Sequence, residues 1–169
     1  MLNIDEIAKQ AVFESDSYRS WPIEDQLNNL GMDVSTFDGR ILDVGCERRG
    51  TLVEHLRKQQ IRAEGIDAWL DRDADYLMNG YAHNIPRPNG TYDLVVSHAG
   101  PYKSGTTACF RRAINLYGLI GAIYVMKTVV GPLLLATTRE LLRVSNPNGQ
   151  VVIWPAPLSF MEYSQNELL

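Results

Sequence analysis

The run RILDVGC at residues 40–46 is short and apolar, carries one acidic residue and closes on a glycine followed by a cysteine. Continuous apolar runs of this length, bounded by turn signals, are typical of buried strands. Residues 51–60 follow, with Leu52, Val53 and Leu56 at helical spacing. The order therefore predicts a strand, a loop and a helix, which together begin an α/β unit.

Further apolar segments continue this alternation along the chain. Strands are expected at residues 62–67, 76–82, 92–97 and 151–154, a helix at residues 138–144 and a turn at residues 146–149. Strands that alternate with helices form a parallel sheet with right-handed crossovers, which places helices on both faces. We therefore predict an α/β fold with a Rossmann-like, mostly parallel sheet of five main strands. The chain between Asp67 and Gly80 is too short for a helix and a strand, so a turn is expected there.

The chain has 169 residues, of which 45% are hydrophobic and 21% charged. This suits one domain that is large enough to bury a core. No linker or repeat divides the chain, so a single domain over residues 1–169 is expected. Its parts are an N-terminal helical cap at 1–38, with a helix at 4–18 that leads into a loop at 21–22, a core at 39–154 and an apolar helical insertion at 105–137.

Charge and cysteine content limit the possible partners and location. The formal net charge of −4 offers no positive field for phosphates, so broad nucleic-acid binding is not expected. Cys46 and Cys109 lie in unrelated surroundings and are expected to be free thiols of a cytoplasmic protein. The start of the chain lacks the pattern of a secretory signal. Lys127 and a Gly-Pro pair interrupt the apolar stretch 114–136, which is interpreted as buried helix rather than a membrane span.

Two features point to a ligand at the carboxyl ends of the strands, where parallel sheets bind their ligands. The loop at residues 45–50 presents free backbone N–H groups at the start of a helix. Asp67 closes the second strand, where an acidic side chain can accept both hydroxyls of a ribose. Together they suit a nucleoside. Taken alone, a tight turn at Gly45 and a helix N-cap at Asp67 explain them equally well.

Four collinear stretches resemble the class I S-adenosylmethionine-dependent methyltransferases, in particular the small-molecule group typified by quinone-biosynthesis enzymes. Residues 40–46 resemble the first motif of that family, and residues 65–67 resemble its acidic second-strand end. Residues 85–98 resemble the approach to its fourth strand, and residues 139–153 resemble the segment that ends in its fifth. The resemblance covers residues 39–154, which is most of the chain.

The resemblance implies S-adenosyl-L-methionine as the cofactor and methyl transfer to a small molecule as the activity. By position, Gly45 would line the methionine part and Asp67 would hold the ribose. Ala82 and His83 would flank the adenine, and Ser97 would edge the transfer site together with His98. The cofactor-binding residues implied are Asp43, Gly45, Cys46, Gly50, Asp67, Ala82, His83 and Ser97.

His98 is the candidate catalytic residue, because a histidine titrates near neutral pH and can act as a general base. A hydrogen-bonded structural histidine is the alternative and the favoured one. The sequence HAGPY at 98–102 lacks the Asp/Asn-Pro-Pro-Tyr signature of methyltransferases that modify amino groups on bases or glutamine, which favours a small-molecule acceptor. No metal site is expected, because His55, His83 and His98 lack paired ligand spacing.

Three positions depart from the family pattern. Glu47 and Arg49 stand where its loop has glycine, and Tyr81 stands where it often has aspartate close to the adenine. Each non-glycine residue forced into a left-handed conformation costs about 1–2 kcal/mol, unless the loop has rearranged. The Glu47 carboxylate would also repel the carboxylate of the cofactor. Arg48 or Arg49 could offset that repulsion, although solvated arginines are the favoured interpretation.

The end of the chain departs as well. About fifteen residues follow the expected fifth strand, whereas the full family fold adds a final antiparallel pair of strands. We therefore expect part of the usual C-terminal strands to be missing. An open edge at the fifth strand, or the apolar insertion at residues 118–135, would invite a homodimer.

These departures place a second hypothesis beside the methyltransferase. It is a catalytically inactive methyltransferase-like protein that serves as a partner subunit or regulator. A third hypothesis, another Rossmann-like nucleotide binder such as an NAD enzyme, ranks last because the glycine spacing is wrong for a pyrophosphate.

Overall fold

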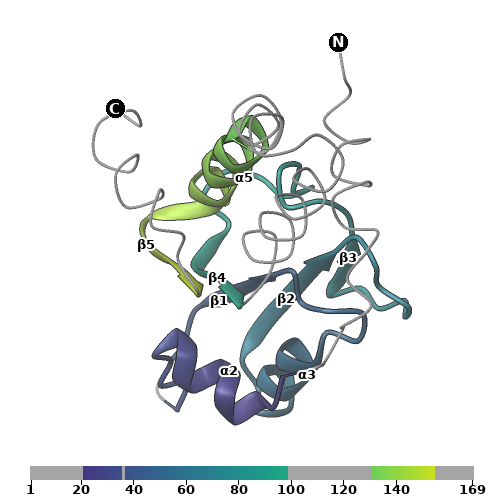
Figure 1. The fold of residues 1–169 in the computed structure, drawn as a ribbon. Coiled ribbons are helices and arrows are strands. Elements are labelled where there is room, and N and C mark those ends of the chain that lie inside the picture. The colour runs from purple at the N-terminus through teal and green to yellow at the C-terminus, as the bar shows by residue number, and fades with distance from the viewer. Residues whose placement is uncertain (1–20, 36, 99–130, 155–169) are drawn as a thin grey trace, which may run out of the picture.

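A parallel five-stranded sheet forms the centre of the molecule (Figure 1). The computed structural model describes residues 21–35, 37–98 and 131–154, and the sheet has the strand order β3-β2-β1-β4-β5. The strands are β1 (Arg40–Val44), β2 (Arg62–Asp67), β3 (Leu77–Asn79), β4 (Tyr92–His98) and β5 (Ser145–Trp154). The helices in these ranges are α2 (Ile23–Leu30), α3 (Thr51–Lys58) and α5 (Gly131–Val144).

Strand β1 lies in the middle of the sheet, between β2 and β4. It pairs in parallel with β2 from Arg40 to Val44, and with β4 from Ile41 to Asp43. Ile41, Leu42 and Val44 expose no surface, so β1 is buried on both faces. Burial on both faces explains why its sequence is a continuous apolar run, and each such side chain contributes about 1.5–3 kcal/mol. The predicted parallel α/β sheet is confirmed.

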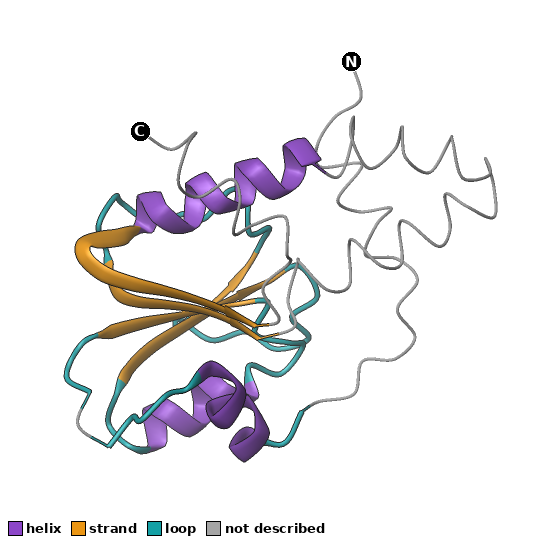
Figure 2. Ribbon diagram, turned by 60° about the vertical axis from the view of Figure 1, so that its left-hand side comes forward, coloured by secondary structure: helices purple, strands orange, loops and turns teal. Residues whose placement is uncertain are grey.

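Helices cover both faces of the sheet, with α2 and α3 on one face and α5 on the other (Figure 2). The core under α2 and α3 includes Leu30, Ile41, Leu52, Val53, Leu56, Ala63 and Val96. The core under α5 includes Leu42, Val44, Ile66, Val95, Leu141 and Val144. The predicted placement of helices on both faces is therefore confirmed, and the two cores share the sheet as their common wall.

Helix α2 is missing from the sequence prediction, which has only a general helical cap and a loop at residues 21–22. Pro22 precedes the helix with φ −52°, a value that is already suited to a helix start. Gly31 ends the helix in a left-handed conformation (φ 63°), and its N–H donates to the Asn28 carbonyl at 3.1 Å. Proline before a helix and glycine after it are the signals that mark these bounds.

The last two elements differ in length from the prediction. Helix α5 begins at Gly131, so residues 131–137 of the expected insertion are part of it. Strand β5 begins at Ser145 and contains the Asn-Pro-Asn-Gly segment 146–149 that is predicted to be a turn. The register between β4 and β5 shifts at that segment, which is the signature of a bulge. The turn residues are accommodated inside an irregular strand.

Two further predictions concern the chain around β3. The third strand is only Leu77–Asn79, shorter than the predicted 76–82. Residues 68–76, all of which are described, contain no helix, so the predicted turn between β2 and β3 is confirmed. The helix expected at residues 4–18, the insertion up to residue 130 and Cys109 lie outside the described residues.

Asp93 joins three strands toward the amino ends of the sheet. From β4, its carboxylate accepts a hydrogen bond from the Arg40 N–H of β1 at 2.8 Å, and a second from the Asn146 side-chain amide of β5. Each partner is 53 residues away along the chain. A single carboxylate therefore fixes the alignment of β1, β4 and β5.

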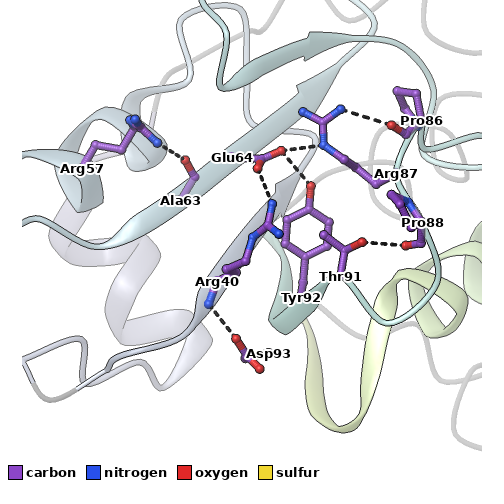
Figure 3. A network of polar contacts seen from close by, with 10 residues as sticks. All are labelled: Arg40, Arg57, Ala63, Glu64, Pro86, Arg87, Pro88, Thr91, Tyr92 and Asp93. Atoms are coloured by element: carbon purple, nitrogen blue, oxygen red, sulfur yellow. Dashed lines mark hydrogen bonds and ion pairs between the residues drawn. The ribbon is translucent and has the colours of Figure 1, made fainter.

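Glu64 of β2 is the centre of a polar network near the same ends of the strands (Figure 3). Its carboxylate accepts hydrogen bonds from Arg40 at 2.9 Å, from Arg87 at 2.8 Å and from the Tyr92 hydroxyl at 2.9 Å. Burial raises the pKa of Glu64, but the bonds from Arg87, Arg40 and Tyr92 outweigh it and hold that pKa below its usual value. Glu64 is thus an ionised and fully satisfied group with a structural role.

Candidate functional site

The loop between β1 and α3 lies at the carboxyl edge of the sheet, where the sequence predicts it. Gly45 has φ 77°, and its N–H donates to the Ile66 carbonyl of β2 at 2.8 Å. Gly50 has φ 60° and leads directly into α3, and a Cβ at Gly50 would come within 2.7 Å of the Leu77 side chain. The left-handed backbone conformation favours glycine at both positions.

Glu47 occupies a glycine-like conformation in this loop, with φ 65°. Its backbone N–H donates to the Asp67 carboxylate at 3.1 Å. Its own carboxylate accepts hydrogen bonds from the Trp21 N–H at 3.3 Å and from the Thr51 hydroxyl at 3.4 Å. These bonds offset the left-handed conformation, which costs about 1–2 kcal/mol. The loop therefore keeps a glycine-type turn with glutamate in it.

Arg49 does not share this conformation, since its φ is not positive. The expectation of two strained positions is therefore wrong, and only Glu47 is left-handed. Arg48 and Arg49 are exposed, and neither forms an ion pair with any residue in the described ranges. This geometry agrees with the interpretation of solvated arginines.

Asp67 ends β2 and lies beside the loop, as predicted. Only 7% of its surface is exposed. One carboxylate oxygen accepts the Glu47 N–H and the other accepts the Trp69 N–H at 2.8 Å. Burial raises the pKa of Asp67, and these two bonds only partly counteract the rise. A carboxylate has about four acceptor positions, so capacity remains for further donors.

Asp43 lies below the loop and is 2% exposed. No hydrogen bond or ion pair joins its carboxyl group to any residue in the described ranges. Burial, together with the charges of Glu47 and Asp67, raises the pKa of Asp43 to about 8. Asp43 is therefore mostly protonated at neutral pH, unless a ligand supplies a partner.

Cys46 is also buried, at 2% exposure, and its thiol is free. Burial and the neighbouring carboxylates of Asp43 and Asp67 raise the pKa of this thiol. A protonated thiol is neither a good nucleophile nor a metal ligand. Cys46 packs in the core under α2 and α3, and its thiol donates to the Glu47 carbonyl at 3.8 Å.

The end of β4 carries an aromatic group made of Trp21, His98 and Trp154. His98 stacks on Trp154, with ring centroids 4.9 Å apart and an angle of 5° between the planes. Trp21 meets His98 edge-on at 5.2 Å and 80°. The Asn29 side-chain nitrogen of α2 lies 3.0 Å from His98 Nε2. Only 6% of His98 is exposed, so its ring is held on several sides.

Ser97 and the residues after β3 complete the predicted set. The Ser97 hydroxyl donates to the Val44 carbonyl at 2.9 Å, which ties β4 to the end of β1. Ala82 packs on the core under α5. The rings of Tyr81 and His83 stack, with centroids 5.4 Å apart and an angle of 22° between the planes. They follow Gly80, whose N–H donates to the Asp67 carbonyl. Tyr81 thus contacts His83 rather than filling the loop.

The structure brings the predicted residues together along one edge of the sheet. Asp43, Gly45, Cys46, Gly50 and Asp67 surround the loop, Ser97 and His98 end the neighbouring β4, and Ala82 and His83 follow β3. In the part of the chain that is described, no three metal-ligating side chains gather. No helix in those ranges is long and apolar enough to cross a bilayer.

The sequence-based site lacks two contacts made by α2, both of which join it to the carboxyl edge. Asn29 bonds His98, and the Gln26 side-chain amide donates to the Trp21 carbonyl at 2.9 Å. Their spacing of three residues on a helix places both amides on one face. That spacing was the only signal available, and it does not by itself identify a partner 69 residues away.

No protein-family model and no curated protein matches the chain. Among solved structures, the PH0226 protein of Pyrococcus horikoshii superposes with a TM-score of 0.51 at 18% identity, over 83% of this chain and 58% of that one. A candidate S-adenosyl-L-methionine-dependent methyltransferase of Methanococcus maripaludis has a TM-score of 0.44 at 22% identity, over 89% of this chain and 60% of that one. An S-adenosylmethionine-dependent methyltransferase of Thermotoga maritima has a TM-score of 0.45 at 15% identity, over 88% of this chain and 59% of that one.

This is a Rossmann-like α/β fold. The likeness to PH0226, together with the observed strand order, shows the fold and no more. The chain spans less than two thirds of the length of each of these structures.

Proposed function

We propose that the chain binds S-adenosyl-L-methionine at the carboxyl edge of β1 and β2 and transfers its methyl group to a small molecule. The observation that carries the proposal is the contact between the loop and Asp67, where the Glu47 N–H meets the Asp67 carboxylate at 3.1 Å. It joins a tight turn at a helix start to an acidic strand end, the pairing that suits a nucleoside. The four collinear sequence stretches support the same ligand.

In this proposal, the residues around the loop bind the cofactor in three parts. Gly45, Cys46 and Gly50 line the methionine part, with Asp43 below them. The free acceptor positions of Asp67 take the ribose hydroxyls. Ala82 and His83 flank the adenine.

Methyl transfer is an in-line displacement from a sulfonium, so the protein mainly has to align the acceptor with the methyl group. Ser97 and His98 end β4 beside the loop and would edge the transfer site. His98 would act as a general base through one of its ring nitrogens, of which Nε2 already contacts the Asn29 side chain. The same contact, with the two tryptophan rings, supports the alternative in which His98 is a structural histidine that shapes the acceptor pocket.

A second candidate function is a catalytically inactive partner subunit or regulator. Two observations favour it: both carboxylate oxygens of Asp67 already accept backbone hydrogen bonds, and Glu47 takes the place of a glycine. Loss of the methyl-donor site with retention of the fold would give such a protein. The two candidates differ in whether adenosyl ligands bind.

Calorimetric titration with S-adenosylhomocysteine separates them. We expect binding to the wild-type chain and at least about tenfold weaker binding to Asp67→Asn, because the amide loses the charge that favours hydroxyl donors. Asp25→Asn, an exposed change on α2, is the matched control and should bind like wild type. Absence of binding at millimolar ligand would reject the methyltransferase and leave the inactive subunit. Transfer of a labelled methyl group to any metabolite fraction would reject the inactive subunit.

The chain is also proposed to work in the cytoplasm, where a free thiol such as Cys46 stays reduced. A homodimer through the edge of β5 is a further part of the proposal. Residues 151–154 of that strand are apolar and only partly buried in the described chain. Such an edge favours pairing with a second chain. Light scattering that finds a monomer at high protein concentration argues against the dimer.

A further inference from the structure

Uncharged side chains contact His98 at the carboxyl end of β4. Its ring stacks on Trp154 of β5 with the centroids 4.9 Å apart, and Trp21 meets it edge-on at 5.2 Å. The side-chain nitrogen of Asn29, on α2, lies 3.0 Å from Nε2 of His98. Only 6% of the His98 surface is exposed. The two tryptophan rings therefore oppose rotation of the imidazole, so each ring nitrogen keeps its place.

The atom of Asn29 that meets Nε2 determines where the imidazole proton lies. An amide nitrogen can only donate a hydrogen bond, so Nε2 of His98 accepts it through its lone pair. A neutral imidazole carries one proton, which then lies on Nδ1. Because the ring is buried, water competes little for this bond. The contact therefore selects one of the two neutral tautomers of His98.

Helix α2 holds Asn29 in place for this contact. Gln26, one turn earlier on the same face, is 3% exposed and donates its side-chain amide to the Trp21 carbonyl at 2.9 Å. Leu30, the residue after Asn29, is buried in the core under α2 and α3. The amide that meets His98 is therefore fixed by a packed helix.

The charged groups of the elements around His98 lie elsewhere. Glu24 and Asp25 of α2 are exposed. Asp93 lies at the start of β4, at the other end of that strand, and β5 carries no charged residue. Among the groups of α2, β4 and β5, the amide of Asn29 is therefore the one that selects the tautomer.

We propose that Asn29 is a positioning residue that fixes His98 as its Nδ1–H tautomer and so withdraws it from general-base catalysis. The inference rests on the proposed function, because it concerns the methyl acceptor. With Nδ1 protonated and the Nε2 lone pair engaged by Asn29, His98 has no lone pair with which to take a proton. The site then takes an acceptor whose attacking atom carries a free lone pair without first losing a proton. That lone pair forms the new bond to the methyl carbon, and the electron pair of the broken C–S bond stays on sulfur.

Nitrogen NMR of the histidine rings in the full chain tests the proposal without any ligand. The chain has three histidines, His55, His83 and His98, so His55→Gln and His83→Gln assign the signals. Two-bond correlations between ring protons and nitrogens at about pH 8, where an ordinary imidazole is neutral, show which nitrogen carries the proton. For His98 we expect the Nδ1–H form to exceed the Nε2–H form by at least about fivefold, which corresponds to about 1 kcal/mol.

His55 is the matched control in the same spectrum. The Gln59 side-chain nitrogen lies 3.0 Å from Nε2 of His55, so the same kinds of atom meet at the same distance, but this pair is exposed. Water replaces an exposed hydrogen bond at little cost. His55 should therefore show a mixture of tautomers, and Gln59→Ala should leave that mixture unchanged.

Two substitutions of Asn29 locate the effect. Asn29→Asp puts a group that only accepts hydrogen bonds beside Nε2 of His98, so that nitrogen should become protonated. Asn29→Leu has a similar size and forms no hydrogen bond, so the excess of the Nδ1–H form should fall toward the ratio of His55. Circular dichroism checks that both variants are folded, and the wild-type spectrum decides the proposal even if neither variant folds.

Three spectra would overturn the proposal. A proton on Nε2 of wild-type His98 would leave the Nδ1 lone pair for a base. A tautomer ratio equal to that of His55, or an Asn29→Asp spectrum that is still dominated by the Nδ1–H form, would show that Asn29 does not set the tautomer. Each of these results leaves the proposed function standing, because adenosyl binding is measured separately. If S-adenosylhomocysteine does not bind, the proposed function is rejected, together with the acceptor requirement that rests on it.

Discussion

Two carboxyl groups on neighbouring strands of the same sheet have opposite surroundings. Glu64 of β2 accepts three hydrogen bonds, from Arg40, Arg87 and the Tyr92 hydroxyl, and its pKa is held below the usual value. Asp43 of β1 has no such partner in the described chain, and burial raises its pKa to about 8. The network of Glu64 stabilises the fold, whereas no such network holds Asp43 in the described residues. The comparison separates a carboxylate that is held ionised by its partners from a carboxyl group that burial keeps protonated.

Removing the satisfied group should have the largest effect on stability. Glu64→Ala leaves the Tyr92 hydroxyl without its partner, on a residue that is fully buried, and separates two guanidinium groups from their carboxylate. We expect the free energy of unfolding to fall by about 2 kcal/mol, measured by urea denaturation at pH 7.

The matched control for Glu64→Ala is Asp38→Ala, which removes an exposed ion pair with Arg62 at 3.8 Å. Its effect should stay below about 0.5 kcal/mol, because exposed pairs contribute little. Equal effects of the two substitutions would contradict the structural role assigned to Glu64.

Replacing Asp43, which has no such partners, should instead stabilise the protein, and only at higher pH. Burial, with the charges of Glu47 and Asp67, raises the pKa of Asp43 from 3.8 to about 8, so the folded state keeps a proton that the unfolded state has released. The associated stability is fully present below about pH 4 and is lost as the pH rises toward 8. Asp43→Asn should flatten this decline and be about 1–2 kcal/mol more stable than wild type at pH 8, by urea denaturation across pH 5–8.

Asp25→Asn, on the exposed side of α2, serves as the control for this pH series and should follow the wild-type curve. Parallel curves for wild type and Asp43→Asn would show that Asp43 titrates normally. That result would remove the difference between the two carboxyl groups.

The smallest expected effect is on the stability of the protein at acidic pH. The folded pKa of Glu64 lies below 4.5, so its stabilising contribution is present above that pH and is lost as the pH falls through the folded pKa. Glu64→Gln should therefore make stability less sensitive to acid. Arg40 and Arg87 are partly exposed, and screening limits the change to below about 1 kcal/mol, measured by thermal denaturation between pH 3 and 5. An unchanged acid slope would show that the network does not hold Glu64 ionised.

The sequence predicts best what burial on both faces dictates. Strands β1 and β4 are found where their apolar runs lie, because a strand buried on both faces needs such a run. Gly45 directly follows β1, Gly50 directly precedes α3 and Asp67 is the last residue of β2, so each lies where the predicted elements put it. The expected strand end identifies Asp67 from the sequence. Nothing in the sequence identifies the backbone N–H groups of Glu47 and Trp69 that bond to its carboxylate.

Other features depend on contacts that no local pattern encodes. The Asn-Pro-Asn-Gly segment 146–149 has turn residues, yet pairing with β4 draws it into β5 as a bulge. Asn29 reaches His98 across 69 residues of chain. The conformation of Glu47 follows the position of a family glycine, but the bonds that hold it, to Trp21, Thr51 and Asp67, become visible only in three dimensions.

Asp93 gives the molecule an order of assembly. Its two hydrogen bonds reach 53 residues backward to β1 and 53 residues forward to β5, so neither can form until distant parts of the chain have met at β4. Contacts that close such long loops are made late in folding, since the entropy of closure must be overcome first. Weakening the two hydrogen bonds of Asp93 should therefore leave the rate of folding nearly unchanged and increase the rate of unfolding. Interactions that are absent from the transition state act on the unfolding rate.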